Sequence, residues 1–152
     1  MNKTLKHIAV LTGWIAIAVA AHLPAAEPKP GSPLFRFGAV ADCQYCKETS
    51  AVRKYNLSPQ KLTACVEHYN KLDLAFVVHL GDFIDRDFES FDVVAPIYNR
   101  LKAPHYHVLG NHDFSVADDK KALVLKRMGL KKRYYDFTHK AWRFIVLDGN
   151  DV

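Results

Sequence analysis

Residues 74–86 read LAFVVHLGDFIDR, an apolar run that ends at a glycine and an aspartate. The run lacks a helical period and only His79 interrupts it, which predicts a strand that is covered on both faces. Asp82 then falls at the carboxyl end of this strand. Gly81 before it lets the backbone of another segment approach closely.

Two other segments of the chain repeat this arrangement. Residues 34–41, LFRFGAVA, lead into DCQ at 42–44, and residues 105–109, HYHVL, lead into GNHD at 110–113. Helices are predicted between the strands, over residues 59–71 and 89–102, from apolar positions at spacings of three and four. The order of strand, helix, strand, helix and strand predicts a parallel sheet with right-handed crossovers. All three polar motifs would then lie at one edge, where such sheets bind ligands.

The pattern after the third motif predicts further local structure. Residues 118–128 predict a third helix that Gly129 stops. Residues 134–138 and 142–147 predict a hairpin that turns at His139-Lys140. Its aromatic side chains are interpreted as cross-strand packing.

The N-terminal segment predicts export. Lys3 and Lys6 precede an apolar run over residues 8–23, followed by small residues, which is typical of a signal peptide over residues 1–26. An uncleaved membrane anchor is the alternative. Residues 27–33 are a Pro/Gly-rich spacer, and the domain is expected over residues 34–152. The chain is therefore expected to be periplasmic or secreted, and to meet a membrane only through an uncleaved N-terminal segment.

Charge and cysteine content restrict the function further. The formal charge of +5 in 152 residues is spread along the chain, except at Lys131-Lys132-Arg133, so no nucleic-acid partner is expected. That basic run is interpreted as a solvated loop. Cys43, Cys46 and Cys65 lack the second pair that a zinc site needs, and they predict either a local disulfide or buried thiols.

The three motifs carry residues suited to a pair of metal ions. Two divalent ions about 3.5–4 Å apart can activate hydroxide and neutralise charge during phosphate ester hydrolysis. Asp82 is the candidate bridge, while Asp42 and Gln44, two apart on an extended segment, would bind the first ion and Asn111 the second. We expect His112 to donate to the phosphoryl group or to the leaving oxygen.

Asp113 is predicted to orient the ring of His112, which makes these two residues the candidate catalytic pair. The oxygen-rich ligand set favours manganese, with iron, zinc or magnesium as alternatives.

The three motifs resemble those of the calcineurin-like metallophosphoesterases in order and spacing, over residues 35–152. The resemblance implies an α/β fold of the metallophosphoesterase type, a layered sandwich, of which this chain would be the N-terminal β-α-β-α-β half plus a hairpin. Gln44 stands where that family usually has histidine. With Tyr45 it resembles the subgroup of manganese-dependent ADP-ribose/CDP-alcohol diphosphatases.

That subgroup implies a small-molecule substrate with a nucleotide-linked pyrophosphate, although a phosphomonoester or phosphodiester also fits. The family completes its metal site with histidines from later segments, including a Gly-His-x-His sequence that this chain lacks. We therefore expect this chain to be the N-terminal half of the enzyme, with its activity alone left open.

Other interpretations give these residues less specialised roles. The scaffold would also suit a non-catalytic secreted binding module, and Cys43 with Cys46 would suit a thiol-redox protein. Asp85 and Arg86 are interpreted as an exposed ion-paired loop. The histidines at 79, 105 and 107 are interpreted as satisfied core or edge residues.

Overall fold

The computed structural model describes residue 31 and residues 33–150. The chain divides into two compact units, residues 1–32 and residues 33–152, and the second unit is the domain described below. The predicted signal peptide at residues 1–26 lies outside the described residues. Within the described part, no helix combines the length and apolarity needed to cross a membrane.

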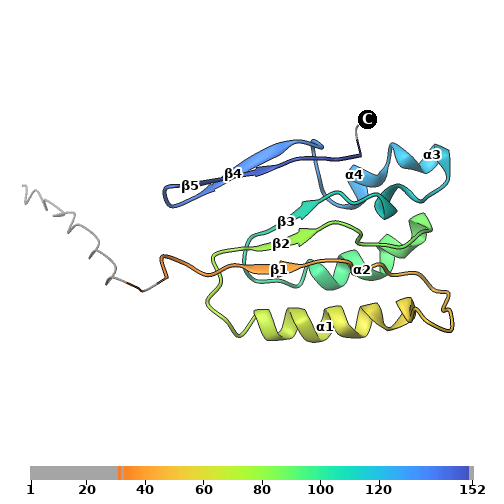
Figure 1. Cartoon of the computed structure of the whole chain (residues 1–152), viewed down its shortest axis with the longest axis horizontal. Coiled ribbons are helices and arrows are strands. Elements are labelled where there is room, and N and C mark those ends of the chain that lie inside the picture. Colours follow the sequence, from red (N-terminus) through yellow and green to blue (C-terminus); the bar gives the residue numbers. More distant parts are fainter. Residues whose placement is uncertain (1–30, 32, 151–152) are drawn as a thin grey trace, which may run out of the picture. The chain divides into compact units, whose positions relative to one another are not determined.

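A parallel three-stranded sheet forms the centre of the domain (Figure 1). It consists of β1 (Gly38–Val40), β2 (Val77–Leu80) and β3 (His105–Val108), in the order β1-β2-β3. Gly38 pairs with Val77, which in turn pairs with His105. The predicted sheet is therefore confirmed, and its strands are shorter than the apolar runs.

Two helices follow β1 and β2, as predicted. The 3-10 helix η1 (Tyr55–Leu57) leads into α1 (Ser58–Tyr69), and η2 (Phe88–Ser90) leads into α2 (Phe91–Tyr98). Pro59 lies in the first turn of α1, where its missing N–H costs no helical hydrogen bond. Pro96 lies inside α2, which ends at Tyr98, and the structure thus shortens the predicted 89–102 helix.

Successive residues of β2 point to opposite faces of the sheet, and each face is covered by different elements. Val77 belongs to the buried core that includes Leu62 and Val66 of α1 and Val94 of α2. Phe76 instead contacts Phe144 of the hairpin, with ring centroids 4.8 Å apart. Figure 1 shows α1 and α2 on one side of the strands and the hairpin on the other.

The segment after β3 is less regular than the sequence pattern indicates. The 3-10 helix η3 (His112–Phe114) comes first. The prediction of one continuous helix over residues 118–128 is wrong, because the structure has two short helices there, α3 (Asp118–Lys121) and α4 (Val124–Arg127). The Leu123 N–H bonds to the Lys120 carbonyl, three residues back, at 2.8 Å, which tightens the turn and ends α3. Gly129, with φ of 69°, ends α4 as predicted.

The predicted hairpin is confirmed as β4 (Tyr135–His139) and β5 (Trp142–Val146). The turn lies at residues 140–141, one position later than predicted, and Lys140 has φ of 52°. The rings of Phe137 and Phe144, which are paired across the hairpin, stack with centroids 5.0 Å apart. The interpretation of the aromatic residues as packing residues is confirmed for these side chains.

Two buried histidines were predicted to be satisfied, and this prediction is wrong. Both ring nitrogens of His79, and Nδ1 of His107, are buried without a hydrogen-bond partner among the described residues. The two rings lie with centroids 5.5 Å apart, and Phe83 and Tyr98 pack around them. Aromatic packing therefore holds these imidazoles in place of hydrogen bonds.

We expect the buried His79 to make the domain sensitive to acid. Burial lowers the pKa of His79 to about 3, whereas the ordinary value is 6.5. As the pH falls, the unfolded chain is protonated at His79 before the folded chain is. The contribution of the neutral His79 ring to stability is therefore fully present above pH 6.5. It falls by about 1.4 kcal/mol per pH unit for this residue as the pH drops toward the folded value.

The His79→Phe variant should reduce this loss and raise the free energy of unfolding at neutral pH, because the ring loses its unpaired nitrogens. Urea unfolding at pH 7 and pH 5.5 measures both effects. His107 remains, so part of the acid sensitivity should persist. The exposed His68→Gln variant is the control, and an equal effect in both variants would contradict the prediction.

Candidate functional site

The three motifs meet at the carboxyl ends of the strands, and Asp82 is their common neighbour. The Gln44 N–H donates to the Asp82 carbonyl at 2.8 Å, and the Asp42 N–H donates to the Gly81 carbonyl at 3.3 Å. From the third motif, the His112 N–H donates to Asp82 Oδ1 at 2.9 Å. The predicted convergence of the three segments therefore occurs in the structure.

Three of the predicted ligands have positive backbone φ angles, which residues other than glycine rarely adopt. The φ angles are 50° at Asp42, 41° at Gln44 and 57° at Asp82. Left-handed conformations at residues other than glycine cost free energy and gather at functional sites. The extended conformation predicted for residues 42–44 is therefore wrong, since two positive φ angles turn the chain around the site.

Two glycines let the second and third motifs pack against each other. A Cβ at Gly110 would lie 2.1 Å from Asp82 Oδ1 and 2.2 Å from the Asp82 nitrogen. Gly81 has φ of 97°, and a Cβ there would lie 3.1 Å from the Gly110 Cα. The close approach predicted at Gly81 is confirmed, and the tighter constraint lies at Gly110.

Asp113 has a different role from the predicted one. Its Oδ1 accepts the Phe83 N–H at 2.8 Å and the Ile84 N–H at 3.3 Å, while Oδ2 accepts the Gly110 N–H at 2.9 Å. Burial raises the pKa of the Asp113 carboxyl to about 6, while these three N–H groups act in the opposite direction. The carboxylate is fully buried and joins the second motif to the third. The prediction that it orients His112 is wrong, because its oxygens are engaged by the backbone.

Asp85 takes the position beside the His112 ring instead. His112 Nδ1 lies 3.0 Å from the Asp85 carbonyl oxygen and 3.3 Å from its carboxylate Oδ1. Asp85 is 4 % exposed and pairs with Arg86 at 2.8 Å. The interpretation of Asp85 as an exposed loop residue is therefore wrong. The apolar residues directly before it, Phe83 and Ile84, were the sequence signal for its burial.

The donors at this edge suit part of a metal site. Carboxylate and amide oxygens are ligands that hard divalent cations take, and Asp82 Oδ1 is held by a backbone N–H. Among residues 33–150, no group of three His, Cys, Asp or Glu side chains is placed to hold a metal ion. Asp42, Gln44, Asp82 and Asn111 thus stay predicted ligands, whose two carboxylates and two amides suit part of a metal site by their chemistry.

A cavity of about 230 Å³ lies beside Asp42. Its lining includes Cys43, Cys65 and, from α1, Ser58 and Lys61. Lys61 is exposed and supplies positive charge next to a predicted metal ligand. The cavity therefore offers room for an anionic group at the edge of the site.

The cysteines near this cavity are free thiols. Burial, together with the nearby charge of Asp113, raises the pKa of the Cys43 thiol to about 12. The reactive thiolate is therefore disfavoured at this position. Of the two cysteine arrangements considered from the sequence, the structure has buried thiols rather than a disulfide.

The fold and the converging motifs are those of the metallophosphoesterase class. Residues 35–151 match the family model of the calcineurin-like phosphoesterases. The chain belongs to this family, and the resemblance seen in the motifs is confirmed.

The matching relatives share a single name. Manganese-dependent ADP-ribose/CDP-alcohol diphosphatases from Arabidopsis thaliana and Oryza sativa subsp. japonica are both 30% identical to this chain. They cover 79% and 78% of it, and the chain covers 44% and 42% of their own lengths. The chain thus spans less than half of the curated relatives it matches.

Solved structures show the same fold. A dimetal phosphatase from Danio rerio superposes with a TM-score of 0.64 at 26% identity, covering 79% of this chain and 46% of the other. Purple acid phosphatase from yellow lupin superposes with a TM-score of 0.50 at 17% identity, covering 79% of this chain and 25% of the other. The predicted α/β fold of the metallophosphoesterase type is therefore confirmed.

Proposed function

We propose that this chain supplies part of the active site of a metal-dependent hydrolase that cleaves phosphoester or nucleotide-linked pyrophosphate bonds. The observation that carries the proposal is the junction at Asp82, where all three motifs are tied together by backbone hydrogen bonds. The family and the names of the relatives support the class of reaction. Two divalent ions, with manganese favoured, are the proposed cofactors.

Each residue has a defined part in the proposed site. Asp82 would bridge the ions, Asp42 and Gln44 would hold one of them, and Asn111 would hold the other. When bound, the ions supply positive charge that activates water and offsets the charge developing on the phosphoryl group. The hydrogen bond from the His112 N–H fixes the direction of the Asp82 carboxylate.

His112 is the proposed donor to the substrate. The Asp85 carbonyl can accept from Nδ1, so the proton lies on that nitrogen and Nε2 is left to face a substrate. Donation from Nε2 then requires the doubly protonated ring, whose positive charge would face the Asp85 carboxylate. Asp85 thus acts through His112, as a positioning residue.

The proposed substrate is a small nucleotide-linked pyrophosphate. Hydrolysis adds water across one P–O–P bridge and gives two phosphate monoesters. Lys61, at the cavity beside Asp42, would attract the anionic substrate. An exported location, from the segment at residues 1–26, is part of the same proposal.

We expect the purified chain to bind Mn²⁺ and expect the Asp82→Ala variant to weaken that binding by about 100-fold or more, because the bridging carboxylate is lost. Isothermal titration calorimetry measures the affinity and stoichiometry. Asp92→Ala is the matched control, since Asp92 is exposed and pairs with Arg127. Equal Mn²⁺ affinity in the wild type and in Asp82→Ala would contradict the proposed site.

Hydrolysis is tested separately with ADP-ribose and Mn²⁺, by chromatography of the products. AMP and ribose 5-phosphate should form and should disappear with a chelator. A folded chain that binds neither metal nor ADP-ribose, but binds another protein, would favour the non-catalytic module. Activity indifferent to chelators would contradict metal-dependent hydrolysis.

A further inference from the structure

A second cavity, of about 490 Å³, lies along β3 away from the predicted metal ligands. It is bordered by the three residues 105–107 of β3 and by the loop from Met128 to Lys132. Asn99, after α2, and Tyr135, at the start of β4, complete the lining. None of the six residues predicted for metal binding or catalysis lines it.

The lining combines positive charge with apolar surface. Lys131 and Lys132 are exposed, and neither ammonium group forms an ion pair with any described residue. Among the described residues, no carboxylate lines the cavity, whereas Met128 and Leu130 supply apolar surface. A ligand with a negative group and an apolar body would match both features.

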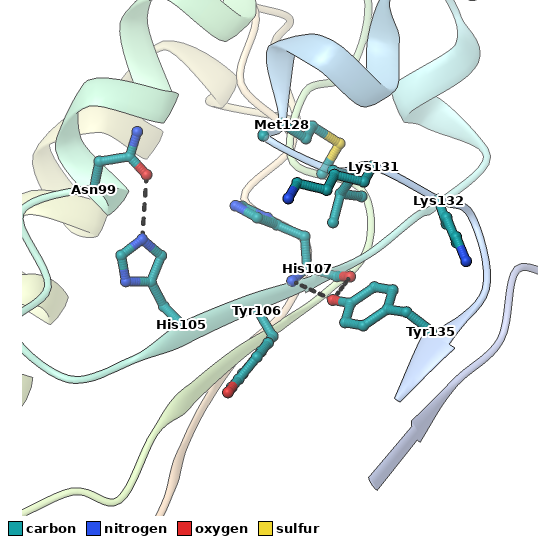
Figure 2. Close-up of a pocket in the computed structure, with 10 residues that line it drawn as sticks. Asn99, His105, Tyr106, His107, Met128, Lys131, Lys132 and Tyr135 are labelled. Carbon is teal, nitrogen blue, oxygen red and sulfur yellow. Dashed lines mark hydrogen bonds between the residues drawn. The ribbon is translucent and has the colours of Figure 1, made fainter. Parts of the chain in front are cut away.

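His107 is the polar side chain that points into this cavity. Figure 2 shows its ring rising from β3 between Asn99 on one side and Met128 and Lys131 on the other. The residue is 6 % exposed, and its Nδ1 has no hydrogen-bond partner among the described residues. Burial of a polar ring without a partner is unfavourable, and a ligand hydrogen-bonded to the ring would offset this cost.

The other polar groups of the lining are already engaged. The Tyr135 hydroxyl donates to the His107 carbonyl at 2.6 Å and accepts the His107 N–H at 3.1 Å (Figure 2). His105 Nε2 lies 3.3 Å from the Asn99 side-chain oxygen. These contacts hold the walls in place, and they leave the His107 ring and the two lysines for a ligand.

We propose that this cavity is a second small-molecule site, which binds an organic anion through Lys131, Lys132 and the His107 ring. The negative group, a phosphate or a carboxylate, pairs with the ammonium groups. A flat ring covers Met128 and Leu130 and forms a hydrogen bond with the imidazole. Burial lowers the pKa of His107 well below its ordinary value, so the ring is neutral and offers both a donor and an acceptor.

The test uses AMP, which joins a phosphate to a flat heterocycle. It is carried out on the whole chain, with a chelator present to keep cations out of the metal site. Nuclear magnetic resonance titration should give saturable shifts at residues 105–107 and 128–132. Inorganic phosphate and adenosine, the two halves of the probe, should each bind about tenfold more weakly or worse. Phosphate binding as tight as AMP binding would overturn the proposal that the apolar wall takes part.

The decisive variant is Lys131→Glu with Lys132→Glu, which changes exposed residues and leaves the core intact. It should weaken AMP binding by about tenfold or more, while Lys71→Glu with Lys102→Glu, an equal charge change at exposed lysines outside the lining, should leave it unchanged. His107→Leu should weaken binding too, and the lysine variant decides the question if His107→Leu fails to fold.

Asp82→Ala separates this site from the metal site, because it should weaken Mn²⁺ binding by about 100-fold or more and leave AMP binding intact. Absence of saturable AMP binding, or equal binding to the lysine variant, would overturn the second site. Neither result would bear on the proposed hydrolase.

Discussion

Replacing Gly110 by alanine should destabilise the domain by about 3–5 kcal/mol and abolish Mn²⁺ binding, because no room exists for the new Cβ. The added atom would lie 2.1 Å from Asp82 Oδ1 and 2.2 Å from the Asp82 backbone nitrogen. The backbone nitrogen cannot move aside without displacing the positive-φ turn at Asp82. Urea unfolding measures the loss of stability, and calorimetric titration measures the loss of metal binding.

Gly149→Ala is the matched control for this prediction. A Cβ at Gly149 would have no atom within 4 Å, so its effect should stay within about 0.5 kcal/mol. If Gly110→Ala unfolds at the same urea concentration as Gly149→Ala, the second and third motifs do not pack as the structure shows.

Replacing Asp113 by alanine should cost about 3–5 kcal/mol of stability, since three buried backbone N–H groups would lose their acceptor. Those groups belong to Phe83, Ile84 and Gly110, on both sides of the junction at Asp82. Asp113→Asn keeps one acceptor oxygen and should lose less. Chemical denaturation of the two variants and the wild type gives the ranking.

The Asp119→Ala variant removes an exposed carboxylate near the same part of the chain and should change the stability by less than about 0.5 kcal/mol. Two roles were considered for Asp113, accepting backbone N–H groups and orienting the His112 ring. They predict opposite effects of its replacement on stability. If Asp113 oriented a catalytic ring, its variants would remain as stable as the wild type and lose only activity. A stable Asp113→Ala protein would therefore contradict the structural role.

Local patterns were sufficient to predict the main elements of the fold. Apolar runs of strand length, each ending at a polar motif, predicted the three parallel strands, and spacings of three and four predicted α1 and α2. The motifs at the carboxyl ends followed from the topology alone. The glycine before Asp82 indicated close backbone approach, whereas the tighter contact at Gly110 was not predicted from the sequence.

Contacts between distant residues decided what the sequence pattern could not. Asp113 reaches Phe83, 30 residues away, and His112 reaches Asp85, 27 residues away. No spacing rule indicates which of two nearby carboxylates is bound by the backbone and which faces an imidazole. The break between α3 and α4 is also decided by contacts between distant residues, because the buried Val124 and Met128 pack into the core.

The sequence by itself determined the parallel pairing of the strands, the edge where the motifs gather and the family to which the chain belongs. The sheet and the position of the motifs depend on local hydrophobic periodicity and on the handedness of the crossover connections, both of which residues close in sequence specify. Only the tertiary structure decided the separate roles of Asp85 and Asp113, the second cavity, and the ring nitrogens of His79 and His107 that lack a partner among the described residues. Those features depend on which groups long-range packing removes from water, and on which partners it then places within hydrogen-bond distance.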